Sequence, residues 1–443
     1  MNELKEKIQN LYELVRDRFY LGDELLGVGD KSYMPVGLFG ILSLIIGGKQ
    51  LVLGDYGSGK TSSSERISSL IKGLPLEFIQ ATTIHAHPEQ TEEKMKATLD
   101  LGALEREGKE VVKWKITPFS PVVIIDEINR LPVGKQSIML NEVDRNIWSY
   151  RGETLMLNQP KTFFATINYQ DIGATRLIPP LLDRFDIAIE TGPAHPVRKR
   201  IIRRGIDEDV LKDRELSQHL IETILKNNVS ASADQVVDFI NQRAEEFKET
   251  LEQRFRLQGL DVRIPRAAEI ETIRREIDQI PLSEDAELLL DYLGQEINCH
   301  YTLNKEFSRC DGCHYQNYIC SDLYSISNRA EQSIFKYARG MAWLVDEREV
   351  TLEHIMAVMP FALWQRSPLS DKKHSEVKDI EKISSDDFYA VADLLREIKK
   401  RWEEHKGYQI EAYLALKNGD FEKLEKLAEQ IGHPFFTSLV REV

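Results

Sequence analysis

The sequence lacks an uninterrupted apolar segment long enough to cross a membrane. Its longest apolar run, residues 36–46, contains two glycines and falls short of the roughly 20 residues that a membrane-spanning helix needs. Residues 1–7 are mostly polar and do not resemble the apolar segment of a secretory signal peptide. We therefore expect a protein without membrane spans, located in the cytoplasm.

The chain also lacks an excess of basic residues. It has 58 Lys and Arg residues against 72 Asp and Glu residues, which gives a formal net charge of −14 at pH 7. Proteins that coat nucleic acid neutralise its phosphates with Lys and Arg side chains. The acidic balance therefore argues against nucleic acid as a general partner, although a local basic patch stays compatible with it.

Cysteine is scarce, and the four residues of this type lie together in the pattern C-x10-C-x2-C-x6-C. Four thiolates at such spacing suit a structural zinc ion, with His300 and His314 as possible substitute ligands. An iron–sulfur cluster uses the same four thiolates, and disulfides or free thiols are further alternatives. The four residues are Cys299, Cys310, Cys313 and Cys320.

A glycine-rich pattern typical of phosphate binding lies near the N-terminus. Apolar residues 51–53 lead into G-x-x-x-x-G-K-[ST], and a helical pattern over 62–74 follows. This order of strand, loop and helix is the context of a P-loop, where backbone N–H groups surround phosphates. Lys60 is expected to reach the β- and γ-phosphates of ATP, and the Thr61 hydroxyl to ligate Mg²⁺. The predicted nucleotide-binding residues of this stretch are Gly54, Asp55, Tyr56, Gly57, Ser58, Gly59, Lys60, Thr61 and Ser62.

Two acidic residues, Asp126 and Glu127, directly follow a second apolar run at residues 121–125. The β-branched residues of this run are typical of a buried parallel strand. An acidic residue at the carboxyl end of such a strand can hold Mg²⁺, and the next can polarise the attacking water. The alternative is that Asp126 only caps the following helix. With a P-loop upstream, the sequence favours a Walker B site, where Asp126 also belongs to the nucleotide-binding residues.

Strand and helix patterns alternate in the first part of the chain. This alternation predicts an α/β fold with a parallel sheet covered by helices on both faces. Residues 145–162 predict a β-hairpin. The predicted strands of the first part are 76–82, 110–116, 121–125, 163–167 and 187–190.

Helical patterns dominate beyond residue 196. The tail from residue 384 is expected to be helical, with Gly407, Gly419 and Gly432 as helix ends. The predicted domains are a nucleotide-binding core at 1–196, a helical lid at 197–366 with a cysteine-rich insertion at 299–320, and a helical C-terminal extension at 367–443.

The ordered motifs resemble those of the AAA+ ATPases and, within them, the MoxR family. The phrase D-E-I-N-R at 126–130 matches that family, and Asn168, within A-T-I-N, is placed like sensor 1. The resemblance implies that Arg184, within D-R-F, is the arginine finger. It also implies that Arg329, within S-N-R-A, is sensor 2, with Arg266 as the alternative. The lid departs from the family pattern because Asn328 replaces a proline and the cysteine segment lengthens it.

The resemblance covers residues 5–196 and 283–366, and it implies a P-loop AAA+ core followed by an α-helical lid. It further implies a homo-oligomeric ring, with six subunits expected, that remodels or activates a protein client, such as one with a von Willebrand factor A domain. Segments 91–117 and 145–160 resemble hairpins that face the ring's pore, with Trp148, Tyr150 and Arg151 as candidates for gripping a substrate. The alternatives are a nucleic-acid motor of the MCM-like type and a nucleotide-gated scaffold with negligible turnover.

Overall fold

The computed structural model describes residues 3–19, 26–168, 175–192, 196, 199–200, 208–297, 326–366, 369 and 386–441. The chain divides into two compact units. The first comprises Met1–Gln279 with Trp343–Asp346, and the second comprises Ile280–Ala342 with Glu347–Val443. The predicted domain boundaries after residues 196 and 366 stay predictions. Among the described residues, no helix is long and apolar enough to cross a membrane.

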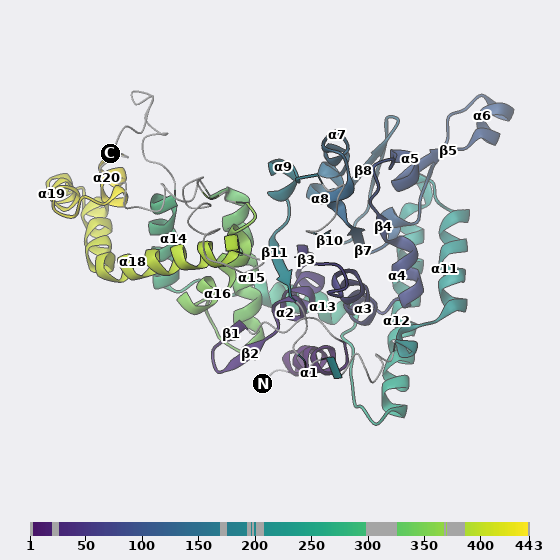
Figure 1. The fold of residues 1–443 in the computed structure, drawn as a ribbon, viewed down its shortest axis with the longest axis horizontal. Helices are drawn as coiled ribbons and strands as arrows, with labels where there is room; N and C mark the ends of the chain where they lie inside the picture. Colours follow the sequence, from purple (N-terminus) through teal and green to yellow (C-terminus); the bar gives the residue numbers. More distant parts are fainter. Residues whose placement is uncertain are drawn as a thin grey trace. The chain divides into compact units, whose positions relative to one another are not determined.

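A five-stranded parallel sheet organises the first unit. Its strand order is β11-β3-β10-β7-β4, and every neighbouring pair is parallel. Figure 1 shows these strands side by side, with α7, α8 and α9 above them and α2 and α3 below. The predicted α/β fold with a helix-covered parallel sheet is therefore confirmed. The strands are β3 (Lys49–Gly54), β4 (Ile84–His85), β7 (Val122–Asp126), β10 (Thr162–Asn168) and β11 (Ile187–Thr191).

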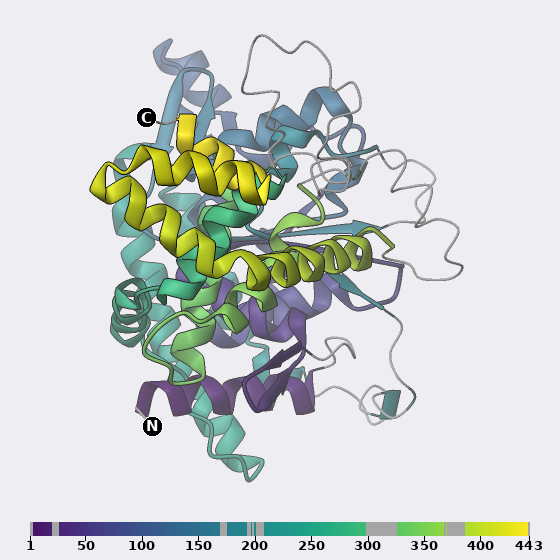
Figure 2. The ribbon, with the colours of Figure 1, turned by 90° about the vertical axis from the view of Figure 1, so that its left-hand side faces the viewer.

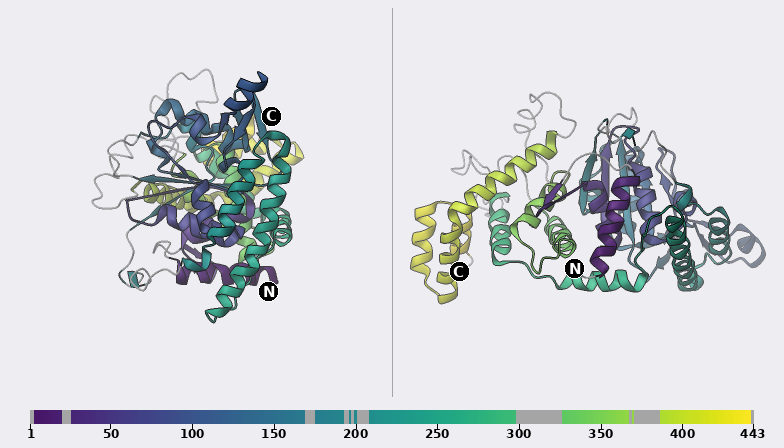
Figure 3. Two further views of the ribbon diagram at one scale, coloured as in Figure 1. Left: turned by 90° about the vertical axis from the view of Figure 1, so that its right-hand side faces the viewer. Right: turned by 90° about the horizontal axis from the view of Figure 1, so that it is seen from below.

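Helices and short hairpins complete the first unit. Helices α11 and α12 lie side by side (Figure 3). The helices are α1 (Glu3–Arg18), α2 (Pro35–Ile46), α3 (Lys60–Lys72), α4 (Leu76–Thr82), α5 (Glu92–Met95), α6 (Leu101–Glu107), α7 (Val133–Gln136), α8 (Leu140–Arg145), α9 (Pro179–Leu182), α11 (Arg214–Lys226), α12 (Ala233–Leu257) and α13 (Ala267–Gln279). The antiparallel pairs are β1 (Leu26–Val28) with β2 (Lys31–Tyr33), β5 (Ala97–Leu99) with β6 (Val112–Trp114), and β8 (Ile147–Tyr150) with β9 (Glu153–Met156). Short 3₁₀ helices occupy Thr117–Phe119, Ile128–Arg130, Ser137–Met139, Asp209–Leu211 and Ser230–Ser232.

Helix α2 explains why the longest apolar run of the sequence is not a membrane segment. All but the last of its residues are buried, and it contacts α1, α3, α13 and strands β3 and β11. Gly47, the residue directly after the helix, has φ 67°, a left-handed conformation that ends a helix with little strain in glycine. The run is therefore a core helix of the first unit.

The prediction of a strand at residues 76–82 is wrong, because this segment is helix α4. Pro75 precedes the first helical residue, and the buried side chains Leu76, Phe78, Ile79 and Thr82 gather on one face of the helix. The strand that joins the sheet is the short β4 directly after it. A short segment in which apolar residues are frequent fits either element by composition alone.

The second unit is helical where it is described. Its helices are α14 (Glu284–Ile297), α15 (Asn328–Leu344, whose last two residues count with the first unit), α16 (Leu352–Leu363), α18 (Asp386–Asn418), α19 (Phe421–Ile431) and α20 (Pro434–Arg441). Figure 2 shows α18 as one continuous helix, so the predicted helix end at Gly407 is wrong. Gly419 and Gly432 do follow helix ends, each with positive φ.

A buried ionic cluster ties the C-terminal helices of the second unit to α14. Glu296 is fully buried and accepts a hydrogen bond from Arg401 at 2.9 Å, while His433 Nε2 lies 2.9 Å from its other oxygen. The backbone N–H of Phe435 donates to His433 Nδ1, which fixes the proton of a neutral imidazole on Nε2. Burial lowers the pKa of His433, which favours this neutral form.

Candidate functional site

The glycine loop begins at the carboxyl end of β3, where the neighbouring strand β11 leaves no room for a side chain at Gly54. Gly54 pairs with Asn168 of β10 on one side and with Thr191 of β11 on the other. Its φ is 149°, and a Cβ atom there would lie 2.4 Å from the Thr191 carbonyl oxygen. Thr191 Oγ1 also hydrogen-bonds Ser58 Oγ at 2.9 Å, which fixes the loop against β11. The sheet thus holds the loop backbone in one place.

Lys60 begins α3 and points its ammonium group back into the loop. Nζ donates to the carbonyl oxygens of Gly54 at 2.8 Å and Asp55 at 2.6 Å. Burial lowers the pKa of Lys60, and the carboxylates of Asp126, Asp55 and Glu127 oppose this effect. Loop carbonyls hold the charge in place, and the nearby acids help to keep it protonated.

Asp126 is the point at which β7, β10 and α3 meet. Its Oδ1 accepts hydrogen bonds from Thr61 Oγ1 at 2.5 Å and from Thr166 Oγ1 at 2.8 Å. His85, on the adjacent strand β4, places Nδ1 3.2 Å from the other carboxylate oxygen. The structure therefore brings together Thr61 and Asp126, the two residues predicted to ligate Mg²⁺.

Glu127 follows Asp126 with a left-handed backbone, at φ 52° and ψ 48°. Its N–H donates to Thr166 Oγ1 at 2.8 Å, so one hydroxyl links the two acidic residues. The Glu127 carboxylate pairs with Arg130 Nε at 2.9 Å and is 28% exposed. The backbone turn thus gives two consecutive carboxylates different partners.

Asn168, the predicted sensor 1 residue, ends β10 at the level of Gly54. Its backbone carbonyl accepts a hydrogen bond from the Asn129 side chain at 2.9 Å. Asn129 belongs to the segment that follows Glu127, so this bond connects the ends of β7 and β10. The parallel register therefore places Asn168, Asp126 and the glycine loop at the same edge of the sheet.

Arg184, the predicted arginine finger, lies at the opposite end of the sheet. Its guanidinium donates to the Pro180 carbonyl at 2.5 Å and lies 3.7 Å from Asp144 of α8. Two residues later, Asp186 accepts a hydrogen bond from the N–H of Lys49, the first residue of β3. The six residues of β3 then separate this level from the glycine loop, about 16 Å at 3.3 Å per residue.

The remaining predicted residues have varied settings. Arg329 is exposed near the start of α15, in the second unit. Arg266, its alternative, pairs with Glu252 of α12 at 3.2 Å within the first unit. Tyr56 is 75% exposed in the glycine loop. The four cysteines, with the zinc or iron–sulfur site predicted for them, lie outside the described residues.

The prediction that Trp148 and Tyr150 of the hairpin grip a substrate is wrong. Hairpin β8–β9 is present as predicted, but Trp148 is fully buried and Tyr150 is 5% exposed. Trp148 lies beneath the Lys161 ammonium, and the Tyr150 hydroxyl donates to Glu93. Their aromatic rings are packed inside the protein, which leaves the exposed turn residue Arg151 as the candidate for contact.

Sequence reasoning missed Thr166, His85, Arg130 and Glu65 as members of the site. Thr166 lies on β10, two residues before Asn168. A single threonine inside an apolar strand does not indicate a functional residue in the sequence. Burial raises the pKa of Glu65, and the nearby Asp126 carboxylate adds to this effect. His85 became a neighbour of Asp126 only through β4, which the sequence did not predict.

The oxygen ligands of the site suit Mg²⁺. Mg²⁺ commonly binds through one or two carboxylates together with phosphate oxygens and water, and it does not need a cage of protein ligands. The hydroxyl of Thr61 and the carboxylate of Asp126 supply such oxygens beside Lys60. Within the described part of the chain, no group of three or more His, Cys, Asp or Glu residues gathers as a metal site.

Comparison with known proteins agrees with this geometry. Residues 49–185 match the AAA domain of the dynein-related subfamily. No curated protein matches the sequence. Among solved structures, the crystal structure of an ATPase candidate from Cytophaga hutchinsonii is 17% identical, covers 90% of this chain and 96% of its own, and gives a TM-score of 0.57. At this identity the likeness shows the fold alone. The chain therefore carries an AAA domain and is an ATP hydrolase that uses ATP and Mg²⁺.

Proposed function

We propose that this AAA-domain ATPase is of the MoxR type and couples Mg-ATP hydrolysis in a ring oligomer to remodelling or activation of a protein partner. The observation that carries the proposal is the contact between Thr61 and Asp126 beside Lys60, within the matched AAA domain. The D-E-I-N-R phrase at 126–130 supports the MoxR type.

The first group of residues binds the nucleotide and its metal ion. The N–H groups of the glycine loop and the ammonium of Lys60 would hold the phosphates, while Thr61 and Asp126 would hold Mg²⁺. When bound, Mg²⁺ neutralises negative charge that develops on the phosphate oxygens. Thr166 and Thr61 donate to the same oxygen of Asp126, so they orient this carboxylate before any ligand arrives.

Glu127 is the proposed base that orients and polarises the attacking water. Its carboxylate pairs with Arg130, so it must exchange this ion pair for the water molecule in order to act. Asn168 would share the task from the neighbouring strand end. Because the backbone of Glu127 is fixed through Thr166, only its side chain has to move.

Arg184 is proposed to act on the nucleotide of a neighbouring subunit. The length of β3 lies between its level in the sheet and the glycine loop of its own chain. An arginine at this position reaches a phosphate only if a second copy supplies the nucleotide. A closed, head-to-tail ring meets this requirement for every copy, and six subunits are the proposed number.

The finer assignments complete the proposal. Arg329 is proposed as sensor 2 on its S-N-R-A context, with Arg266 as the alternative. The four cysteines are proposed to hold a structural zinc ion, with an iron–sulfur cluster as the alternative. The client is proposed to be a protein, such as one with a von Willebrand factor A domain. The proposed domain limits stay at residues 196 and 366.

A subunit-mixing experiment tests the shared site. Arg184→Ala alone should lower ATP turnover by about 10³-fold or more, as expected for loss of an arginine finger. Lys60→Ala alone should abolish turnover by weakening phosphate binding. Equal mixing should restore turnover at about a quarter of the subunit contacts in a ring, because these pair an intact loop with an intact arginine.

The matched control is Arg145→Ala. Arg145 also approaches Asp144, at 4.0 Å, but its side chain is 71% exposed, so this variant should keep its turnover. If the mixture stays inactive while both variants remain folded and assembled, the shared site is wrong. Strong stimulation of the wild-type enzyme by DNA would instead favour the nucleic-acid motor.

A further inference from the structure

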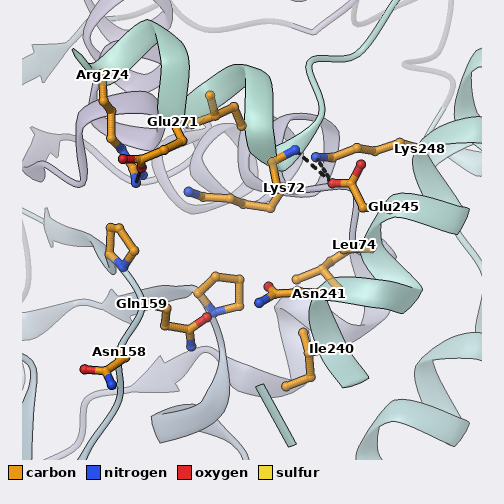
Figure 4. Close-up of a pocket in the computed structure, with 15 residues that line it drawn as sticks. Lys72, Leu74, Asn158, Gln159, Ile240, Asn241, Glu245, Lys248, Glu271 and Arg274 are labelled. Carbon is orange, nitrogen blue, oxygen red and sulfur yellow. Dashed lines mark hydrogen bonds and ion pairs between the residues drawn. The ribbon is translucent and has the colours of Figure 1, made fainter. Parts of the chain in front are cut away.

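The C-terminal end of α3 lines a cavity of about 270 Å³ in the first unit, away from the glycine loop. Figure 4 shows Lys72 of α3 between side chains of α13, Glu271 and Arg274, and side chains of α12, Glu245 and Lys248. The 13 residues of α3 separate Lys72 from Lys60, about 18 Å at 1.5 Å per residue. The cavity is therefore distinct from the nucleotide site.

Three cationic side chains line this cavity, but they have few acidic partners. Lys72 Nζ donates to the Leu44 carbonyl at 2.8 Å, and no described carboxylate lies within ion-pair distance of it. Arg274 lies 3.5 Å from Glu271, which it shares with Arg275. The cations thus exceed the negative charge available to them.

Lys248 is the most buried of the three, with 2% of its surface exposed. It pairs with Glu245 at 2.8 Å, and the same carboxylate also accepts a hydrogen bond from the N–H of Ala267. A buried cation normally needs a partner that neutralises it. Here the single carboxylate divides its hydrogen bonds between a side chain and the backbone.

The carbonyl groups at the end of α2 satisfy only some of the N–H donors of these cationic side chains. Lys72 and Arg274 each donate one hydrogen bond to them, at Leu44 and Ile45, and cations are favourable at a helix C-terminus. An ammonium has three N–H donors and a guanidinium has five. Several donors of Lys72 and Arg274 are therefore left for another acceptor, while Lys248 donates to Glu245.

The opposite side of the cavity has amide and apolar groups. Figure 4 shows Asn158, Gln159 and Asn241 on this side, together with Ile240 and Leu74. Amide side chains donate hydrogen bonds to oxyanions, and apolar groups cover the body of a ligand. The volume lies just below the usual range for ligand pockets, which favours a small molecule.

We propose that this cavity binds a small molecule that carries an oxyanion group, a phosphate or a carboxylate, held by Lys72, Arg274 and Lys248. Gly73 supports a built site, because a Cβ atom there would lie 2.4 Å from Lys248 Cγ and 2.7 Å from the Ala244 carbonyl. This close approach fixes the end of α3 against α12, so Lys72 and Lys248 are positioned before a ligand binds.

Binding should draw a proton onto Lys72. Burial and the adjacent charges of Arg274 and Lys248 lower the pKa of Lys72 to about 7. The facing groups on α12 and α13 are Lys248, Glu245, Glu271 and Arg274. An anion beside Lys72 raises this pKa, so a non-titrating anion should be taken up together with a fraction of a proton near pH 7.5.

Calorimetric titration of the full chain with sulfate and, separately, with succinate tests the proposal. Sulfate represents phosphate groups, and succinate represents carboxylates. A Lys60→Ala background weakens anion binding at the glycine loop. We expect saturable binding of at least one anion, weakened about tenfold or more by Lys72→Gln and by Arg274→Gln. Lys226→Gln is the matched control, an exposed lysine in the last turn of another 13-residue helix.

Proton uptake gives a second measurement that does not depend on the stability of one variant. Titrations in two buffers of different ionisation heat should reveal uptake that Lys72→Gln removes and Lys226→Gln keeps. Absence of saturable binding for both anions would overturn the proposal. Equal affinity in the Lys72→Gln, Arg274→Gln and Lys226→Gln proteins would overturn it as well. If Lys72→Gln does not fold, the proposal is tested by the anion affinity of Arg274→Gln and by proton uptake in the protein that retains Lys72.

Discussion

The two ends of α3 each carry a lysine with a lowered pKa, but the two side chains differ in their partners. Lys60 donates to two loop carbonyls, and three carboxylates counter the effect of its burial. Lys72 donates to one carbonyl, and its charged neighbours Arg274 and Lys248 lower its pKa further, to about 7. At one end of the helix, nearby carboxylates offset the lysine's positive charge, and at the other end they do not.

The comparison shows that burial of a lysine does not by itself indicate a function. The balanced end fits the chemistry of phosphate transfer, which needs a fixed positive charge close to acidic metal ligands. The end with excess positive charge fits an anionic ligand that supplies the missing negative charge. The following predictions separate the two ends.

The largest effect is expected at the carboxyl edge of the sheet. Glu127→Gln keeps the size of the side chain but removes the base, so ATP turnover should fall by about 10²- to 10⁴-fold. Binding of ATP should persist, because Lys60 and Asp126 are unchanged. Steady-state hydrolysis and equilibrium binding of a fluorescent ATP analogue measure the two properties. Glu107→Gln, at an exposed position of α6, is the control; turnover retained by Glu127→Gln would refute the role of Glu127.

A large loss of stability is expected at the other end of α3. Gly73→Ala forces alanine into a left-handed conformation and places a methyl group against Lys248 and the backbone of α12. The free energy of unfolding should fall by about 2–4 kcal/mol. Gly108→Ala is the matched control, since Gly108 also follows a helix with positive φ but has no atoms within 4 Å of the added Cβ. Urea unfolding that finds equal losses would contradict the tight contact.

The smallest effect concerns the pH dependence of stability. Because the pKa of Lys72 is about 7 when folded and 10.5 when unfolded, the unfolded state binds more protons between these values. Stability should therefore rise with pH across this window. From pH 7 to pH 10 the wild type should gain roughly 1–3 kcal/mol more than Lys72→Met. Urea unfolding at both pH values, without added oxyanions, measures the difference; identical pH dependence would show that Lys72 is hydrated.

Local motifs carried most of what the sequence could predict. The glycine loop, Asp126, Glu127 and Asn168 each lie next to a strand whose apolar residues are visible in the sequence, so their common edge followed from a parallel sheet. Thr166 was missed because its role depends on the pairing of β7 with β10. Segment 76–82 was mistaken for a strand because seven apolar-rich residues fit both periodicities.

The cavity could not be predicted, because its residues come from distant parts of the chain. Lys72, Lys248 and Arg274 belong to three helices and have no common motif. Gly407 was mistaken for a helix end because glycine is a local signal for a helix end. Packing elsewhere in the fold overrides that signal. Gly407 lies inside α18, where packing of Trp402 and Ala412 on either side keeps the helix continuous. Tertiary contacts form the cavity and keep α18 continuous, and a short segment of sequence does not reveal such contacts.

The left-handed backbone of Glu127 has a consequence for engineering. A non-glycine residue in this conformation costs on the order of 1 kcal/mol or more, a noticeable share of the 5–15 kcal/mol that typically separates folded from unfolded protein. Glycine would relieve that cost, so a search for heat-resistant variants could select it. Such a selection would yield a more stable protein that no longer hydrolyses ATP.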